Sequence, residues 1–306
     1  MTGFALPRPV DRIEEGSEVA GMGSYAITGA ASGMGRATAE QLRRDGHTVI
    51  GVDLRETDVV ADLSTPHGRA AAAGQVLDRA GGRLDGAVCA AGLGGIRGRD
   101  RAVLQVNYYG VVDLLDAWRP ALAAARNSKV VVFGSNSTTL TPMVPDGAVR
   151  ALLDGNPDKA LRVVKRFGRR SAHFAYASSK MAVTRWARRA AVSPRWAGVG
   201  IRLNVLAPGV MATPLLDEQL AGGQRREIEQ LAVPIGGRGR PEDAGAWVRF
   251  MLSPAADFLC GAVIFLDGGS DAYFRTDDWP ASTGPVGVIR YQRRARAWRK
   301  GAAGSA

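Results

Sequence analysis

The chain has 306 residues, of which 46% are hydrophobic, and its formal net charge is +11. This length and composition indicate one folded domain, with strand and helix signals alternating through most of it. No apolar run is long enough to span a bilayer, which excludes a membrane-spanning protein.

The first 22 residues contain Glu14 and Glu15 but not the cationic and apolar blocks of a signal peptide. We interpret residues 1–22 as a loose leader that precedes the folded domain. Met22 stands just before the first predicted strand. Our hypothesis is that Met22 is the true start, which mass spectrometry of protein from its native host would decide.

A glycine-rich segment follows the first predicted strand, residues 25–27, and precedes a helix-like stretch, residues 36–44. Strand, glycine turn and helix form the context of a dinucleotide site. Glycine lets the backbone approach a pyrophosphate, which then lies at the positive N-terminal end of the helix. The residues predicted to bind the cofactor here are Gly29, Ser32, Gly33, Met34 and Gly35.

The second predicted strand, residues 47–52, ends at Asp53, about 20 residues beyond the glycine turn, where an acidic residue reaches the ribose hydroxyls. A carboxylate there repels the 2′-phosphate of NADP, so we expect NAD as cofactor, with Leu54 beside it. Asp62 and Leu63 end the next short extended stretch and are placed to cover the adenine. Two arginines near the strand ends oppose this choice, since either could pair with a phosphate: Arg36 and Arg55.

Two polar candidates lie in the middle of the chain. Asn107 falls inside a predicted helix, residues 100–118, where asparagine is a poor helix former and calls for a reason. Its alternative interpretation is an ordinary polar helix residue. Ser135 follows the predicted strand 130–133 and can project over the crevice at the carboxyl edge of a sheet. Ser137 is the reserve candidate, with the alternative role of a turn residue.

Residues 142–171 separate this serine from the next motif and carry apolar residues at helical spacing. We expect helices with one apolar face, which could wall a substrate pocket or form a subunit contact. An inserted helix must bury its apolar face somewhere, so we favour the contact. A homo-oligomer, with a dimer favoured, is the resulting prediction.

Tyr176 and Lys180 are four residues apart, which places them on one face of a helix. A free tyrosine has a pKa of about 10, and a fixed neighbouring cation favours the phenolate. We therefore predict that Lys180 lowers the pKa of Tyr176 and makes it a proton donor and acceptor. The alternative is a pair of solvated surface residues.

A further strand is predicted at residues 201–206, and Pro208-Gly209 then turns the chain over the nicotinamide end. Residues 210–235 combine leucines with charges. Amphipathic helices there could close as a lid over an apolar substrate. Ordinary packing against the domain is the alternative.

These motifs together resemble the short-chain dehydrogenase/reductase superfamily, from about residue 24 to residue 272. The resemblance implies an α/β fold, a single doubly wound Rossmann-type domain over residues 23–278 with a parallel central sheet flanked by helices. In family order the motifs are the glycine turn, Asn107, Ser135, Tyr176 with Lys180, Pro208-Gly209 before Thr213, and Asp267-Gly268-Gly269. One departure is Cys89-Ala90, where the family has two asparagines that help to fix the central strand.

The resemblance implies a role for each catalytic candidate. Tyr176 exchanges the hydroxyl proton, Ser135 holds the substrate oxygen, and Asn107 holds a water that links the lysine to bulk solvent. Lys180 also binds the nicotinamide ribose, and Thr213 meets the carboxamide. The further cofactor contacts implied are Ala91, Gly92, Tyr176, Lys180, Pro208, Gly209, Val210 and Thr213.

The long separation of Ser135 from Tyr176 is similar to that of the bacterial 3α-hydroxysteroid dehydrogenase/carbonyl reductase branch. This resemblance implies interconversion of secondary alcohols and ketones with NAD(H), on steroids or smaller carbonyl compounds. One alternative is a dehydrogenase of terpenoid, alicyclic or other xenobiotic alcohols. A second is a catalytically silent NAD-binding sensor.

The tail, residues 279–306, is basic and interleaves tyrosine and tryptophan with its charges. Such arms can bind nucleic acid or anionic lipid, but we expect this one to wrap a partner subunit or lie disordered, with no nucleic-acid or membrane partner.

Cys89 and Cys260 lack Cys-x-x-Cys spacing, so we expect reduced thiols in a cytoplasmic protein. No metal site is expected, because the three histidines are isolated: His47, His67 and His173.

Overall fold

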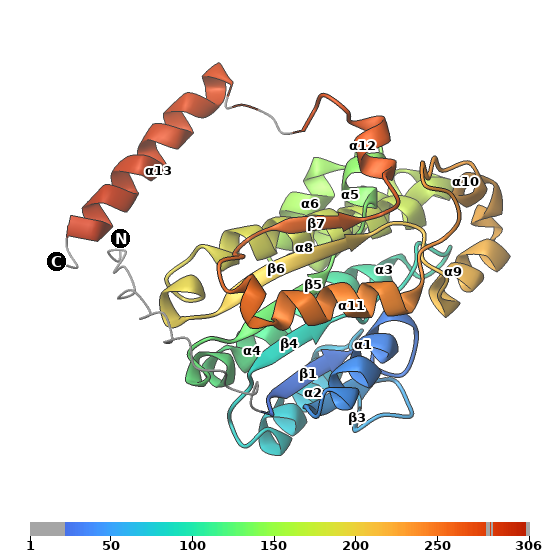
Figure 1. Ribbon diagram of the computed structural model, residues 1–306. Coiled ribbons are helices and arrows are strands. Elements are labelled where there is room, and N and C mark those ends of the chain that lie inside the picture. The colour runs from blue at the N-terminus through green and yellow to red at the C-terminus, as the bar shows by residue number, and fades with distance from the viewer. Residues whose placement is uncertain (1–21, 280–281, 283, 304–306) are drawn as a thin grey trace.

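The computed structural model describes residues 22–279, 282 and 284–303. Its centre is a seven-stranded sheet in which every pairing is parallel and the strand order is β3-β2-β1-β4-β5-β6-β7 (Figure 1). The strands are β1 (Ser24–Thr28), β2 (Thr48–Asp53), β3 (Val59–Val60), β4 (Gly86–Cys89), β5 (Lys129–Phe133), β6 (Arg202–Pro208) and β7 (Val263–Leu266). The expected leader, apart from Met22, lies outside the described residues.

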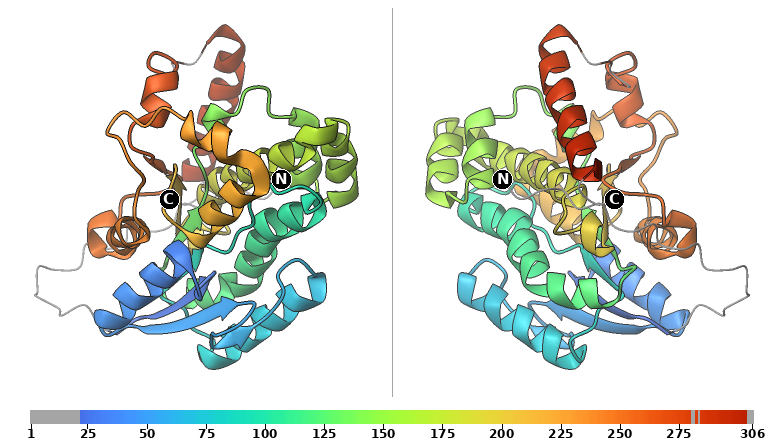
Figure 2. Two further views of the ribbon diagram at one scale, coloured as in Figure 1. Left: turned by 90° about the vertical axis from the view of Figure 1, so that its right-hand side faces the viewer. Right: turned by 90° about the vertical axis from the view of Figure 1, so that its left-hand side faces the viewer.

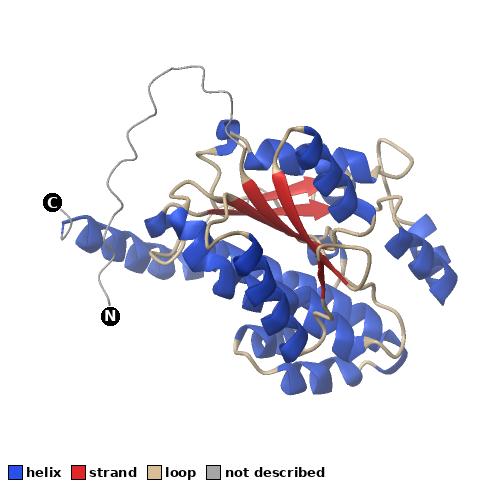
Figure 3. Cartoon of the chain, turned by 90° about the horizontal axis from the view of Figure 1, so that it is seen from below, coloured by secondary structure: helices blue, strands red, loops and turns tan. Residues whose placement is uncertain are grey.

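Helices enclose the sheet on both sides, as Figure 3 shows. Those of the first half are α1 (Gly33–Arg44), α2 (Pro66–Arg79), α3 (Asp100–Leu104), α4 (Gly110–Ala124), α5 (Ser137–Leu140), α6 (Asp146–Leu153) and α7 (Pro157–Lys165). Those of the second half are α8 (Ser171–Ala191), α9 (Pro214–Gln219), α10 (Arg225–Glu229), α11 (Pro241–Leu252), α12 (Ser270–Phe274) and α13 (Pro285–Ala303).

The core divides into one cluster on each face of the sheet. Side chains alternate between the faces of a strand, so Val130 and Val132 of β5 join one cluster while Val131 and Phe133 join the other. Helices α1 and α11 cover the second face, and α2, α4 and α8 cover the first. Burial on both faces explains why β5 is apolar from Val130 to Phe133.

The strand order places a topological switch between β1 and β4. The chain leaves β1 toward β2 on one side and reaches β4 on the other, so the loops after β1 and β4 diverge. In open α/β sheets a crevice for ligands forms at this point, outside the carboxyl ends of the strands. The doubly wound Rossmann-type architecture expected from the sequence is confirmed.

The predicted insertion contains helices α6 and α7, drawn in light green beside α8 in Figure 2. Their apolar faces pack against α8 and α3 of the same chain, and the side chains that are fully buried are Ala148, Val149, Ala151, Leu152, Ala160 and Val164. The need to bury these faces is thus met within the chain. The homo-oligomer stays a prediction that this packing does not test.

The basic tail contains a helix, α13, which extends away from the sheet in Figures 1 and 3. Four large apolar side chains of α13 are exposed among its arginines: Val288, Ile289, Tyr291 and Trp298. None of the helices in the described part of the chain is both long and apolar enough to cross a membrane.

Replacing Leu152 by alanine is expected to lower the free energy of unfolding by about 2–5 kcal/mol, because a fully buried leucine leaves a cavity. Denaturant unfolding measures this change. Phe167→Ala, at a side chain that is 40% exposed, is the control and should cost much less. A neutral Leu152→Ala would mean that α6 does not belong to the domain core.

Candidate active site

The turn between β1 and α1 is built for a close backbone approach. Gly29 and Gly33 have φ angles of 73° and 53°, in the left-handed region that favours glycine. A Cβ atom on Gly35 would lie 2.1 Å from the carbonyl oxygen of Gly29, so only glycine allows α1 to begin this close to the turn. The predicted phosphate cradle is therefore present at the N-terminus of α1, and it fits a dinucleotide.

A cavity of about 500 Å³ runs from this turn along the carboxyl edge of the sheet. Predicted cofactor residues that line it are Gly29, Ser32, Gly33, Met34, Gly35, Asp53, Leu54, Asp62, Leu63, Ala91, Gly92 and Thr213. Asp53 stands at its end, where its carboxylate accepts hydrogen bonds from the backbone N–H of Ala31 at 3.0 Å and of Leu54 at 2.7 Å. The Asp62 carboxylate accepts from the N–H of Ser64 at 2.8 Å.

The two arginines that opposed NAD lie outside the lining of this cavity. Arg36 pairs with Glu40 at 3.7 Å on the exposed face of α1, and Arg55 is exposed in the loop after β2. The charge beside the expected ribose position is therefore the carboxylate of Asp53.

Thr28 replaces part of the support that the asparagines give in the resembled family. Its hydroxyl oxygen accepts from the N–H of Ala91 at 3.1 Å, and its carbonyl accepts from the N–H of Ala90 at 3.2 Å. Gly92 then passes so close to Asn107 and Lys180 that a Cβ would lie 3.4 Å from the asparagine oxygen and 3.6 Å from Nζ. The loop after β4 is thus fixed despite the Cys89-Ala90 departure.

A second cavity, of about 330 Å³, adjoins the first, and five residues line both: Met34, Ala90, Gly92, Thr213 and Leu215. It contains the catalytic candidates Ser135, Tyr176 and Lys180. The remaining predicted residues line it at the end of β6 and just beyond: Pro208, Gly209 and Val210. All the predicted site residues except Asn107 thus line one continuous crevice.

Ser135 and Tyr176 line the same cavity, and the Ser135 hydroxyl acts to lower the pKa of Tyr176. Ser135 lies just beyond β5, where its hydroxyl oxygen accepts from the N–H of Ser137 at 3.1 Å and its carbonyl accepts from the Thr138 hydroxyl at 2.8 Å. Ser137 also lines the cavity, but the hydroxyl that acts on the pKa of Tyr176 is that of Ser135. This effect favours Ser135 over the reserve candidate.

Lys180 is buried and donates from Nζ to the carbonyl oxygen of Phe133 at 2.8 Å, while Nζ lies 6.0 Å from the centroid of the Tyr176 ring. Burial lowers the pKa of Lys180 to about 8, because desolvation disfavours the ammonium. Burial likewise raises the pKa of the neighbouring Cys89 thiol to about 12, so this thiol is neutral at pH 7.

The predicted lowering of the Tyr176 pKa by Lys180 is wrong for this structure. Burial raises the pKa of Tyr176 above its usual value, and the Ser135 hydroxyl only partly opposes the rise. The ammonium bonds to the end of β5 and contributes no resolved shift to the phenol. Tyr176 is therefore a protonated acid near neutral pH.

The predicted helix over residues 100–118 is interrupted by a π turn, Gln105–Tyr109, between α3 and α4. Asn107 lies in this turn and is fully buried. Its Oδ1 accepts from the N–H of Leu93 at 2.8 Å, and its Nδ2 donates to the Leu93 carbonyl at 3.0 Å and to Ser179 Oγ at 3.2 Å. Ser179 in turn donates to the carbonyl of Tyr176 at 2.7 Å.

Asn107 therefore ties the loop after β4 to the helix that carries Tyr176. This arrangement excludes the alternative of an ordinary polar helix residue. The sequence signal was an asparagine in a helix, but the π turn itself was not predicted. Such turns are frequent at functional sites. The expected water beside Asn107 stays a prediction.

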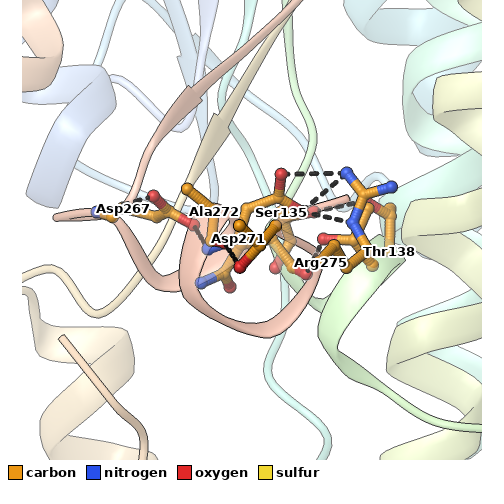
Figure 4. Close-up of polar contacts among 10 residues, drawn as sticks. Ser135, Thr138, Asp267, Asp271, Ala272 and Arg275 are labelled. Carbon is orange, nitrogen blue, oxygen red and sulfur yellow. Dashed lines mark hydrogen bonds and ion pairs between the residues drawn. The ribbon is translucent and has the colours of Figure 1, made fainter. Parts of the chain in front are cut away.

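Sequence reasoning missed a polar network that supports the Ser135 loop from the C-terminal side (Figure 4). Asp267 follows β7 and accepts from the N–H of Asp271 at 2.7 Å, and Arg275 donates to both carboxylate oxygens of Asp271 at 2.8 and 2.9 Å. Helix α12, which carries Asp271, packs against α5, which follows Ser135. The sequence did contain a signal for this network, because Asp271 and Arg275 are oppositely charged and four residues apart.

The predicted lid is helical and forms part of the wall of the catalytic cavity. Helices α9 and α10 flank a π turn, Leu220–Gln224, and the lid residues that line the cavity are Leu215, Leu216, Gln219, Ile228 and Leu231. This position supports the interpretation of a substrate cover. Closure of the lid stays a prediction.

Comparison with known proteins identifies the family. A family model described as Enoyl-(Acyl carrier protein) reductase matches residues 163–271. Over 255 residues, 83% of this chain and 98% of the relative, the chain is 37% identical to the 3-alpha-hydroxysteroid dehydrogenase/carbonyl reductase of Comamonas testosteroni. The chain belongs to the short-chain dehydrogenase/reductase superfamily. It is an oxidoreductase of that superfamily, and the resemblance drawn from its motifs is confirmed.

Two further members of this short-chain dehydrogenase/reductase group are informative. The crystal structure of the 3-alpha-hydroxysteroid dehydrogenase from Pseudomonas sp. B-0831, complexed with NADH, is 43% identical, with a TM-score of 0.78 over 83% of this chain and 99% of that one. The cis-4-hydroxycyclohexanecarboxylate dehydrogenase of Sinomonas cyclohexanicum is 31% identical over 261 residues, 80% of this chain and 95% of the relative. The described residues contain no cluster of three or more His, Cys, Asp or Glu side chains able to hold a metal ion.

The network around Asp271 should make the free energy of unfolding depend on pH in the acid range. Burial by itself would raise the pKa of this carboxyl, but the hydrogen bonds from Arg275, the Thr139 hydroxyl and the charge of Arg275 together lower it. A carboxyl with a lowered pKa in the folded state adds stability above its unfolded pKa of about 4, and this is lost as the pH falls through the folded value.

Replacing Asp271 by asparagine should therefore lower the free energy of unfolding by about 1–3 kcal/mol at pH 7. Denaturant unfolding across pH should show the difference from wild type shrinking below about pH 4. Asp277→Asn, at an exposed position nearby, is the control and should be close to neutral. If the variant lost the same free energy of unfolding in acid as at pH 7, the charge of Asp271 would not be what stabilises the loop.

Proposed function

We propose that the protein is an NAD(H)-dependent oxidoreductase that interconverts a secondary alcohol and a ketone on an apolar, alicyclic substrate. The observation that carries this proposal is that Ser135 and Tyr176 line one cavity, which is continuous with the dinucleotide crevice. The catalytically silent NAD-binding sensor is the weaker candidate, because binding alone does not require this pair.

Several residues would hold the cofactor. The glycine turn would receive the pyrophosphate, and Asp53 would accept hydrogen bonds from the ribose diol. When bound, the nicotinamide supplies or accepts the hydride. The choice of NAD over NADP is supported by the carboxylate of Asp53 in the lining, by the absence of Arg36 and Arg55 from that lining, and by the NADH complex of the Pseudomonas relative.

Tyr176 carries the proton in this mechanism. In ketone reduction the protonated phenol donates to the carbonyl oxygen, and Ser135 holds that oxygen in line. In alcohol oxidation Tyr176 must first lose its proton. The raised pKa of Tyr176 makes this loss harder at neutral pH, and an increase in pH favours it. Lys180 positions the helix from the carbonyl of Phe133 and presents a partly charged amine to the crevice at pH 8.

The walls of the catalytic cavity support an apolar substrate. Its aliphatic lining includes Leu140, Pro142, Met211, Leu215, Leu216, Ile228 and Leu231. Its volume of about 330 Å³ suits one alicyclic molecule rather than a polymer. The named substrates of two relatives, a 3α-hydroxysteroid and a hydroxycyclohexanecarboxylate, belong to this class. A terpenoid or other xenobiotic alcohol fits the same walls.

Replacing Tyr176 by phenylalanine should lower kcat by roughly 100- to 10,000-fold, the usual contribution of a general acid or base. Absorbance of the reduced nicotinamide, followed with a panel of hydroxysteroids, cyclic alcohols and their ketones, measures this loss. Wild-type oxidation should accelerate as the pH rises above neutral, while reduction should not. Tyr273→Phe, at an exposed tyrosine outside both cavities, is the matched control. Full activity of Tyr176→Phe would refute the mechanism.

Replacing Asp53 by alanine should weaken the preference for NAD over NADP by about 10-fold or more in kcat/KM, because the repulsion of a 2′-phosphate is removed. The ratio of the two specificity constants, measured with one substrate, gives the result. Asp62→Ala retains the ribose-facing carboxylate and serves as the control. An unchanged ratio would mean that Asp53 does not select the cofactor.

A further inference from the structure

The catalytic cavity has an uneven distribution of charge. Its titratable lining residues are Arg170, His173, Tyr176 and Lys180, and the described residues contribute no aspartate or glutamate to its wall. Most of the remaining lining is aliphatic or glycine. Fixed positive charge without a compensating carboxylate favours an anionic group in this space.

The four titratable residues follow one face of α8. Arg170 immediately precedes the helix, and His173, Tyr176 and Lys180 come three, three and four residues further on, which are same-face steps. Six residues of helix separate the Cα atoms of Arg170 and Tyr176 by about 9 Å along the axis. The row therefore begins with a permanent cation, Arg170, and reaches the proton-transfer group, Tyr176, further along the same face.

Arg170 is exposed at the mouth of the cavity, and its guanidinium carbon lies 5.3 Å from the centroid of the Phe174 ring. Stacking on an aromatic ring orients a guanidinium and leaves its N–H groups free to donate in plane. No ion pair in the described part of the chain involves Arg170, whereas the nearby cations Arg101 and Lys165 pair with Asp158 and Asp100.

The cofactor does not account for this cation. The phosphates of a dinucleotide would lie at the glycine turn in the other cavity, whose lining does not include Arg170. The anion that Arg170 would meet therefore belongs to the substrate.

We infer that the substrate is an alicyclic alcohol or ketone that carries a carboxylate, with the carboxylate bound by Arg170 while Tyr176 and Ser135 hold the reacting oxygen. This inference rests on the proposed function and names the substrate class of the same site. Arginine is suited to the role because its planar fork matches a carboxylate in two hydrogen bonds. Arg170 thus determines specificity and does not take part in the proton transfer.

Two pairs of ketones test the inference. One pair is 4-oxocyclohexanecarboxylate and its carboxamide, and the other is a 3-oxosteroid with a carboxylate side chain and its carboxamide. Each pair differs in charge but hardly in shape. Wild-type enzyme should prefer the carboxylate in at least one pair by about 10-fold in kcat/KM, mostly through KM, and the preference should fall with added salt.

The Arg170→Gln variant should lose that preference by a rise in KM for the carboxylate, while its turnover of the carboxamides stays near wild type. Arg169→Gln is the matched control, since Arg169 is equally exposed but does not line the cavity. Equal use of both members of each pair by the wild type, or a preference that survives in Arg170→Gln, would overturn the inference.

The same experiment separates this inference from the proposed function. Turnover of the carboxamides without any charge preference would leave the NAD-linked alcohol and ketone chemistry standing and remove only the role of Arg170. A complete absence of turnover with all four ketones would overturn both.

Discussion

The hydrogen bond from Lys180 to the carbonyl oxygen of Phe133 connects the two parts of the site. An ammonium that is buried needs a partner, since a buried charge without one is strongly destabilising. The partner here is the last residue of β5, so the bond fixes α8 against the strand end from which Ser135 projects. Tyr176, one turn earlier on α8, is thereby brought to Ser135. The lowered pKa of Lys180 is the cost of this arrangement.

Around this bond, the structure supports each catalytic group from a different part of the chain. Asn107 reaches α8 from the π turn, and Thr28 holds the loop after β4. Asp271 and Arg275 reach the Ser135 loop from beyond β7. These supports come from segments far apart in sequence, because the sheet order brings the carboxyl ends of their strands to one edge. The crevice is therefore supported by several distant segments of the chain at once.

Much of the framework could be predicted from the sequence because its signals are local. A glycine turn between an apolar run and a helix gives the β1–α1 unit, and the spacing of Tyr176 and Lys180 gives their shared face. The insertion helices were also predictable from apolar spacing, but their partner was not. The surface they pack on, α3 and α8, is assembled only by the fold.

The features that escaped prediction depend on long-range contacts. The apolar pattern of residues 100–118 continues through the π turn, and the reason for the turn lies in Leu93 and Ser179, which are distant in sequence. The rise in the Tyr176 pKa comes from desolvation, which no spacing reveals. The packing of α12, which carries Asp271, against α5 likewise requires β7 to lie beside β6.

The π turn also constrains how long this helix can be. A π turn contains one residue more than the α-helical turn it replaces, so Gln105–Tyr109 amounts to a single-residue insertion in an otherwise regular helix. Removing one of these residues other than Asn107 would restore α geometry and rotate one flank by roughly 100° about the axis. Asn107 would then point away from Leu93 even though its identity was unchanged. At this place the chain is thus as sensitive to a gain or loss of one residue as it is to substitution of the asparagine.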